Sequence, residues 1–207
     1  MPHDERAAHG VDRDRLDAFT DHAADHPEEV ALGLGARSTY EGTCGHSLSK
    51  VDGYTLGDEV IVRESREYTI PYGSWKELLD AGGWVGATDR MDPIEGALAA
   101  LAACVNVGIT VNAVANGVDV EGLQTRVRTE FDPRVLFGLA DLTEADAVFE
   151  NLTVEIEIEG EDLDKDLVDE WARRAPVYTL VSHVQDVEVT ITTPAELSSA
   201  DPRGDPE

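Results

Sequence analysis

Two segments in the second half of the chain alternate between hydrophobic and polar residues with a period of two. In residues 152–159, four hydrophobic side chains from Leu152 to Ile158 share one face, and three glutamates share the other. This alternation predicts a strand with one face in a core and one in water. Residues 123–131 behave similarly, because every second residue from Leu123 to Thr129 lies on one face. We therefore expect two half-buried strands.

Residues 92–117 form a long, nearly uncharged run with clear helix signals at both ends. Asp92 can cap the helix, Pro93 fits its first turn, and Glu95 can reach back to the amide of the cap. An Asn-Gly pair is typical of the helix end. After the first turn the helix has no Asp, Glu, Lys or Arg, and it carries Cys104 near its middle. We expect it to be buried in a core or an interface. Its asparagines argue against a lipid-facing span.

The first half of the chain has weaker patterns. Residues 1–29 combine Asp, His and Arg with a weak helical pattern that stops at Pro27, which predicts a loosely attached N-terminal helix. In residues 30–70, glycines separate short segments rich in β-forming residues, which predicts a meander of antiparallel strands. A short helix is expected from a cap at Ser74 through Leu79.

An amphipathic helix follows the second alternating strand. Asp162 or Asp164 can begin it, and Leu163, Leu167 and Trp171 define the face expected to be buried.

The chain after this helix is expected to end in a helix, a strand and a tail. Pro176 can open a short helix through His183, and residues 187–191, VEVTI, have the alternation of a final strand. Residues 193–207 are rich in Pro, Gly and Asp, which predicts a disordered tail. The order of elements predicts an α+β domain over residues 30–192, preceded by the extension at 1–29.

Charge narrows the choice of partners and surroundings. The 207-residue chain has 43 acidic residues against 16 Lys and Arg, a formal net charge of −27. Such a surface repels nucleic-acid phosphates and anionic lipid, so we expect neither nucleic acid nor a membrane as partner. The acidic residues are spread along the whole sequence, which indicates a halophilic protein kept soluble at high salt. The polar N-terminus has no secretory pattern, and we expect a cytoplasmic protein.

Cysteine and histidine spacing gives no strong metal or disulfide motif. Cys44 and Cys104 are 60 residues apart with no CxxC pair, so neither a structural disulfide nor a zinc knuckle is indicated. His22 and His26 have a spacing that metals can use, but a solvated acidic helix end is the simpler interpretation. Gly33 begins a GLG that no helix follows, so a dinucleotide-binding loop is excluded. We expect no cofactor and no metal.

Two motifs resemble the OsmC/Ohr superfamily, which includes thiol-dependent organic hydroperoxide reductases. The first is MDPIEGALAALAAC, similar to the family's Asn-Pro-x-Glu-Leu-Leu-Leu-Ala-Ala-Leu-x-x-Cys segment. The second is RRAPVYTLVSHVQDVEVTI, similar to the family's Cys-Pro-Val segment and the helix and strand after it. One departure stands out, because Ala175 replaces the second, resolving cysteine.

The resemblance implies an OsmC-like α+β fold, with antiparallel sheets around a buried central helix, in an intertwined homodimer with thiol sites at the interface. It implies that Cys104 is a peroxidatic nucleophile for a small organic peroxide, with an external thiol reductant. Arg37 is the best positional match for the arginine that the family places beside the thiol. Glu95 matches the acidic residue that pairs with this arginine in some members. Weaker alternatives to Arg37 are Arg63, Arg66, Arg126 and Arg128.

Each of these assignments has a simpler alternative. Cys104 fits equally as a small hydrophobic residue in a core, and Arg37 as a solvated strand residue. Glu95 fits better as part of the helix cap, because nine helical residues place it about 13.5 Å from Cys104 on the opposite face. Cys44, in the flexible segment EGTCGHS, is a weak candidate to replace the missing cysteine at Ala175. The alternative function is a non-catalytic dimer that binds a small apolar ligand or has a structural role in stress.

Overall fold

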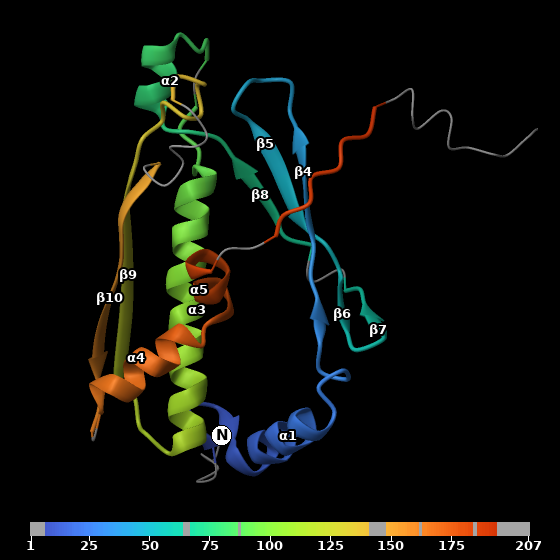
Figure 1. Cartoon of the computed structure of the whole chain (residues 1–207), viewed down its shortest axis with the longest axis vertical. Coiled ribbons are helices and arrows are strands. Elements are labelled where there is room, and N and C mark those ends of the chain that lie inside the picture. The colour runs from blue at the N-terminus through green and yellow to red at the C-terminus, as the bar shows by residue number, and fades with distance from the viewer. Residues whose placement is uncertain are drawn as a thin grey trace, which may run out of the picture.

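The structure, a computed structural model, describes residues 7–63, 67–86, 88–140, 148–161, 163–183 and 186–193. It is an α+β arrangement around one long helix, α3 (Pro93–Asn116). Figure 1 shows α3 upright, with a two-stranded hairpin on its left, α4 and α5 in front of it, and the N-terminal strands on its right. All of the strand pairs in the described residues are antiparallel, apart from one isolated bridge between Ser74 and Asp89.

The ends of α3 follow its local sequence signals. The Asp92 carboxylate accepts a hydrogen bond from the N–H of Ile94 at 2.8 Å, and Glu95 accepts one from the N–H of Asp92 at 2.9 Å. This capping box fixes the first turn. At the other end, Gly117 has a φ of 72°, the left-handed conformation that favours glycine after a helix. Both predicted ends of this helix are confirmed.

A long hairpin packs along one side of α3. Strand β9 (Gly122–Phe131) pairs with β10 (Phe149–Glu159), and β9 contacts α3. The predicted inward face is confirmed at the α4 end of the hairpin, where Val154 and Ile156 pack against the core. Leu152 differs, because it is 47% exposed beside an irregularity in the pairing between Glu150 and Thr153.

Two helices complete the core around α3. Helix α4 (Lys165–Arg173) begins after Asp164, whose carboxylate accepts from the N–H of Asp166, and α5 (Pro176–Ser182) follows it. The predicted burial of Trp171 on α4 is confirmed, at 3% exposure, and Leu163 is half-buried. The prediction for Leu167 is wrong, because it is 41% exposed while its neighbour Val168 is buried instead. The helix is rotated so that Val168 and Ala172 face the core, where α4 contacts both α3 and α5. Asp162, the alternative start, lies outside the described residues.

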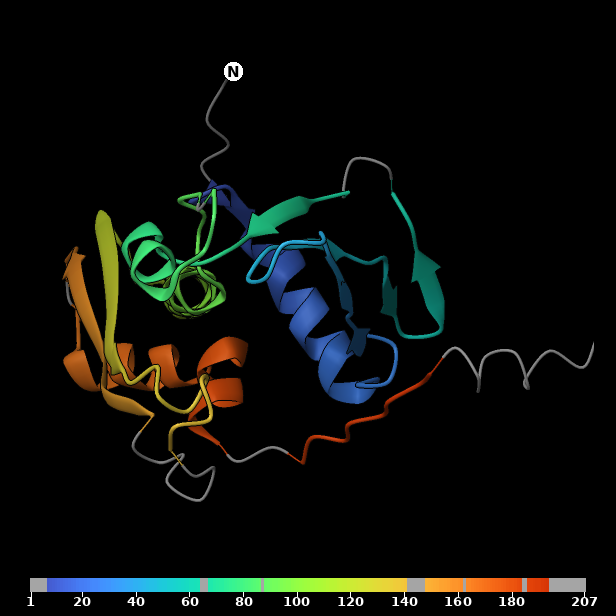
Figure 2. The ribbon, with the colours of Figure 1, turned by 90° about the horizontal axis from the view of Figure 1, so that it is seen from above.

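The N-terminal strands form two small sheets, as the predicted meander requires. The first sheet has the order β3-β6-β7 and the second the order β4-β5-β8. The bounds of these strands are β3 (Leu32–Gly33), β4 (Ala36–Tyr40), β5 (Ser47–Val51), β6 (Tyr54–Leu56), β7 (Glu59–Ile61) and β8 (Thr69–Tyr72). All five residues of β4 are exposed. Viewed from above in Figure 2, these sheets stand apart from the hairpin, on the other side of α3.

The remaining elements lie at the ends of α3 (Figure 1). A short ribbon of β1 (Ala7–Ala8) and β2 (Val11–Asp12) leads into α1 (Arg13–Asp25), which ends before Pro27 as predicted and has no buried residue. Helix α2 (Lys76–Gly82) starts after Trp75, not after Ser74 as expected. Ser74 instead joins the bridge to Asp89, so its position is set by that pairing and not by the helix.

The predicted final strand at residues 187–191 is absent. The structure assigns no secondary structure to this segment, and Val187, Val189 and Ile191 are 79%, 78% and 80% exposed. A strand needs an edge to pair with, and this segment leaves α5 without meeting one in the described part of the chain (Figure 1). The tail predicted from residue 193 onwards lies, except for its first residue, outside the described residues.

Helix α3 has a one-sided burial. By length and composition it could cross a membrane, a test that core helices of soluble proteins also pass, and 28% of its most apolar stretch is buried. Leu101, Val105 and Ile109 face the core at 2%, 0% and 0% exposure. On another face, Val107 and Val111 are 60% and 46% exposed. The prediction that α3 is buried is therefore confirmed for one face of the helix, whereas another face is exposed in the single chain.

Candidate functional site

Cys104 lies where α3 passes the start of α5. Its neighbours Leu101 and Val105 are fully buried in the core, and Cys104 is partly buried against the edge of that core. The thiol is therefore shielded on its core side and accessible on the other.

A backbone amide faces the sulfur. The N–H of Val177 donates a hydrogen bond to Sγ of Cys104, with a nitrogen–sulfur distance of 3.4 Å. Pro176 occupies the first position of α5 and has no N–H, so Val177 supplies the first free amide of that helix. An N–H donor stabilises negative charge on the atom that it faces. The contact therefore suits a cysteine that reacts as a thiolate.

Gly108 brings α5 close to the thiol. A Cβ at this position would lie 3.1 Å from the carbonyl oxygen of Trp171 and 3.3 Å from Cβ of Ala175, so a larger residue would push the connection away. Ala175 is 0% exposed at the N-cap of α5. Positions 104 and 108 share a helix face, so Ala175 and Cys104 lie on the same side of α3.

The structure does not bring Arg37 to Cys104 within one chain. Arg37 lies on β4 and forms an ion pair with Asp52. The next residue, Ser38, lines a groove of about 490 Å³ together with residues of α3, including Ala100. Successive side chains of a strand face opposite sides, so Arg37 faces away from α3. Its role beside the thiol stays a prediction, and this geometry would require a second copy of the chain.

The weaker arginine candidates also have other surroundings. Arg126 and Arg128 lie on the exposed face of β9, within ion-pair distance of Glu155 on β10. Arg63 lines a cavity with Arg37, and Arg66 lies outside the described residues. Among the residues that the structure describes, the hydrogen-bond partner of the Cys104 sulfur is an amide, not a cation.

Glu95 is engaged at the start of its helix. Its carboxylate accepts the N–H of Asp92, as the capping-box interpretation predicts. Nine residues separate it from Cys104, which places the two side chains on different faces of α3. A catalytic role for Glu95 therefore stays a prediction, and its structural role is clear.

Cys44 lies in a different environment from Cys104. It is exposed in the turn between β4 and β5, where its carbonyl oxygen accepts a hydrogen bond from Nε1 of Trp84 at 2.8 Å. Both cysteines are free thiols. The described hydrogen-bond partner of the Cys104 sulfur is on α5 and is not Cys44. The replacement of the resolving cysteine at position 175 by Cys44 therefore stays a prediction.

An apolar cavity of about 440 Å³ opens one helical turn before Cys104. Leu101 belongs both to its wall and to the core that flanks the thiol. Thr129 is the one polar side chain among the lining residues, so the cavity suits a hydrocarbon group. The walls come from α3, the hairpin and α5: Pro93, Ile94, Ala97, Leu98, Leu101, Thr129, Phe149, Leu152 and Val181.

Sequence reasoning missed Val177 and Gly108. The contribution of Val177 is a backbone N–H, which every residue except proline has, so its identity gives no signal. Pro176 was recognised as a helix start, and that was the available clue to a free amide one residue later. In the sequence, Gly108 is recognisable only as a small residue one helical turn after Cys104, whereas its close contact with the Trp171–Ala175 segment depends on how the helices pack.

Comparison with solved structures finds similar chains at low identity. An OsmC-like protein from Mycoplasma pneumoniae is 14% identical, with 74% of this chain and 89% of that chain covered and a TM-score of 0.47. The organic hydroperoxide resistance protein OhrB of Bacillus subtilis is 15% identical, with 72% and 90% covered and a TM-score of 0.40. The organic hydroperoxide resistance protein OsmC from Legionella pneumophila is 14% identical, with 72% and 88% covered and a TM-score of 0.41.

The family assignment rests on the sequence. No curated protein matches the chain. The family model described as OsmC-like protein matches residues 86–190, just over half of the chain. The matched region contains Cys104, the cavity and the start of α5, and it leaves out Arg37. The chain belongs to the OsmC-like protein family.

Proposed function

We propose that the chain is a thiol peroxidase that reduces organic hydroperoxides through Cys104, with an external thiol as reductant. The observation that carries this proposal is the N–H of Val177 directed at the Cys104 sulfur, one helical turn from an apolar cavity. The family match covers all of these elements. The cavity supplies a place for the organic group, and the amide supplies a donor for a thiolate.

The reaction needs one cysteine and a peroxide. The thiolate attacks the terminal oxygen of R–O–O–H, the S–O bond forms as the O–O bond breaks, and the departing alkoxide takes a proton to give R–OH. Cys104 is oxidised to a sulfenic acid. An external thiol then condenses with it to form a mixed disulfide and water, and a second external thiol restores Cys104 by disulfide exchange. The cycle uses a single cysteine because Ala175 provides no second sulfur at the position of the resolving cysteine.

We propose further that the working form is a homodimer. Helix α3 exposes an uncharged stripe that includes Val107 and Val111, and residues 187–191 have strand alternation without an edge to pair with. A second copy could cover the stripe and supply the edge. It could also bring Arg37 of the partner subunit towards the thiol, since Arg37 faces away from α3 within one chain.

The charge supports a proposal about the surroundings of this dimer. At −27, a chain with an exposed uncharged stripe would be self-repelling unless salt screens it. We propose a cytoplasmic protein of a high-salt cell. Light scattering should report a dimer in molar salt, with loss of folded protein on dilution into low salt. A monomer in molar salt would contradict the dimer, and unchanged stability in low salt would contradict the halophilic assignment.

A second candidate function is a non-catalytic dimer that binds a small apolar ligand. The observation that favours it is the combination of the apolar cavity with Ala175 in place of a resolving cysteine. In that case the thiol of Cys104 would be part of the cavity edge, and peroxide would leave it unchanged.

Trapping the oxidised thiol separates the two functions. Stoichiometric cumene hydroperoxide followed by dimedone should give an adduct at Cys104 by mass spectrometry, and Cys104→Ser should abolish peroxide consumption. Cys44→Ser is the matched control, because it removes the other thiol and should change neither result. An unmodified Cys104 would favour the binding function, and a Cys44–Cys104 disulfide would make Cys44 the resolving residue.

Restoring the second sulfur tests the position of Ala175. Ala175→Cys should allow a disulfide with Cys104 if the two Cα atoms lie within about 7 Å. Turnover with a dithiol reductant should then exceed that of the parent. Equal turnover, with Cys104 still forming a sulfenic acid, would show that the second motif is aligned incorrectly.

A further inference from the structure

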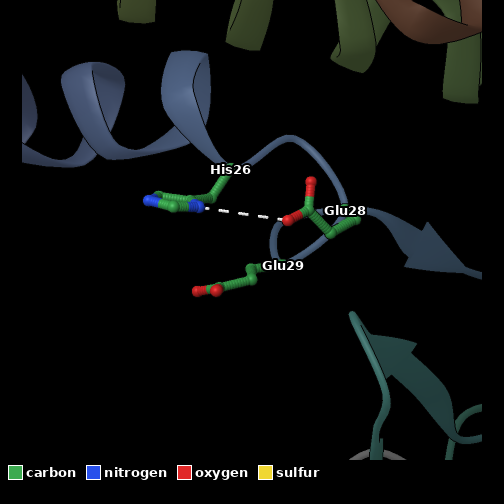
Figure 3. A group of neighbouring side chains, drawn as sticks. All are labelled: His26, Glu28 and Glu29. Carbon is green, nitrogen blue, oxygen red and sulfur yellow. Dashed lines mark ion pairs between the residues drawn. The ribbon is translucent and has the colours of Figure 1, made fainter.

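Three side chains of types that can bind a metal, His26, Glu28 and Glu29, meet where α1 ends, with His22 beside them and far along the chain from the thiol. His22 and His26 lie one turn apart at the end of α1, with ring centroids 5.0 Å apart. Glu28 and Glu29 follow in the turn towards β3, where the N–H of Glu29 donates to the carbonyl oxygen of His26. Figure 3 shows His26 and the two glutamates directed towards a common space.

The distances within this group suit one small cation. Potential ligand atoms of His26, Glu28 and Glu29 all lie within 4.8 Å of one another. Nδ1 of His26 lies 3.9 Å from Oε1 of Glu28, and Nε2 of His22 lies 3.0 Å from Oε2 of Glu29. Ligand atoms around a tetrahedral zinc ion are separated by about 3.3 Å, given bonds of about 2.0 Å. These exposed side chains need only small rotations to close around an ion.

The backbone that carries the two glutamates is held in place. Gly57 has a φ of 53°, and a Cβ there would lie 3.0 Å from the carbonyl oxygen of Glu29 and 3.3 Å from that of Glu28. Its N–H also donates to the carbonyl oxygen of Ala31 at 2.8 Å. The turn between β6 and β7 therefore fixes the glutamate turn from one side, while α1 fixes the histidines.

We propose that His26, Glu28 and Glu29 bind a divalent transition cation of the zinc class, with His22 orienting Glu29. Imidazole together with carboxylates favours zinc, nickel or copper over magnesium or calcium, which bind through oxygen alone. The role is structural. Since α1 has no buried residue, an ion that joins its end to the turn before β3 would fix the helix against the N-terminal sheets. This site is independent of Cys104.

Calorimetric titration of the full chain with Zn²⁺ tests the site. Excess Mg²⁺ should be present to occupy nonspecific acidic positions, and the thiols should be alkylated beforehand to remove them as ligands. One ion should bind per chain and raise the melting temperature. His26→Ala and Glu29→Gln should each weaken that binding at least about tenfold and remove most of the melting shift.

The matched control is His9→Ala. His9 is also exposed and lies 2.7 Å from the carboxylate of Asp119, and it belongs to no group of three potential ligands among the described residues. This variant should bind Zn²⁺ like the parent. The proposal is overturned if the parent binds no ion at a 1:1 ratio, or if His26→Ala and Glu29→Gln bind as tightly as His9→Ala does.

Discussion

The two halves of the chain are stabilised in different ways. In the C-terminal half, residues 93–183, one cluster that includes Ile109, Trp171 and Ala175 joins α3, α4 and α5, and the hairpin packs against it. In the N-terminal half, residues 7–72, the strands pair with one another, but β4 is exposed along its whole length. His46 is the one buried side chain among the described residues of that half, at 8% exposure.

This difference separates strand formation from core formation. Alternating sequence and turns are enough to pair β4 with β5 and β8, but burial needs a second surface. The C-terminal half finds that surface in α3. The N-terminal half lacks it within one chain, which is why the proposed dimer matters for its stability as well as for the thiol site. The following changes test this contrast.

The largest effect is expected from a core substitution in the C-terminal half. Trp171→Ala should lower the free energy of unfolding by about 3–5 kcal/mol, because Trp171 is 3% exposed and fills the space between α4 and α3. Urea unfolding followed by circular dichroism measures the change. Tyr40→Ala, on the exposed strand β4, is the comparison. It should cost less than about 0.5 kcal/mol if the strand remains in water.

A loss larger than this in Tyr40→Ala would mean that β4 is covered in solution. That outcome would support the dimer. If Trp171→Ala lowered the free energy of unfolding by less than about 1 kcal/mol, the proposed difference between the two halves would be wrong, since the C-terminal core would then not be the main source of stability.

The close contact at Gly108 should give the next effect. Gly108→Val would place side-chain atoms against Trp171 and Ala175, which should cost about 1–3 kcal/mol and move α5 away from the thiol. The movement of α5 should change the rate at which the Cys104 thiol is alkylated, compared with the rate in the parent protein. Ala99→Val is the control, because Ala99 is exposed on the same helix and more than two turns away from Gly108. Similar results for both variants would show that the α5 contact is not needed.

The uncharged stripe of α3 should respond to an added charge. Val107→Glu should weaken dimerisation by at least tenfold, about 1.4 kcal/mol, because it places an unpaired carboxylate at the proposed interface. Light scattering over a range of protein concentrations measures this. Leu139→Glu adds the same charge at a residue that is 74% exposed outside α3 and should leave the dimer unchanged. Equal behaviour of the two variants would place the interface elsewhere.

The smallest effect is expected at a surface ion pair. A hydrogen bond from the Arg173 guanidinium lowers the pKa of Asp169 below its ordinary value of 3.8. The ion pair therefore stabilises the folded chain above pH 3.8, and this contribution is lost as the pH falls through the lowered folded-state pKa. Arg173→Gln should remove a small stabilisation at neutral pH and none in strong acid. Unfolding curves across that range check it, and a difference that grows towards low pH would contradict the sign.

Elements with local signals were predictable from the sequence. Asp92, Pro93 and Glu95 define the start of α3 by contacts within four residues, so no tertiary information was needed. The alternation in residues 152–159 likewise identifies β10. The segment at 187–191 has the same kind of alternation but no strand in the structure. The difference is the presence of a pairing edge, which is a tertiary property that alternation does not encode.

The candidate site divides in the same way. Cys104 was identified from its motif, and the structure places an amide donor and an apolar cavity beside it. The orientation of Arg37 depends on which face of β4 is turned towards α3, a choice that the sequence of the strand leaves open. The rotation of α4 that buries Val168 and exposes Leu167 was similarly decided by packing against α3.

The donor to the sulfur has a consequence for how this site tolerates genetic change. The N–H of Val177 belongs to the backbone, so a codon change at position 177 preserves the donor for every replacement except proline. Its direction is set by the fold of the Ala175–Pro176 connection and by the close approach at Gly108. Residues near the thiol can therefore be replaced in evolution while the hydrogen bond from the amide of position 177 to the Cys104 sulfur persists. Mutational robustness of this kind belongs to the donor alone, because the sulfur of Cys104 and the close approach at Gly108 still depend on the side chains at those two positions.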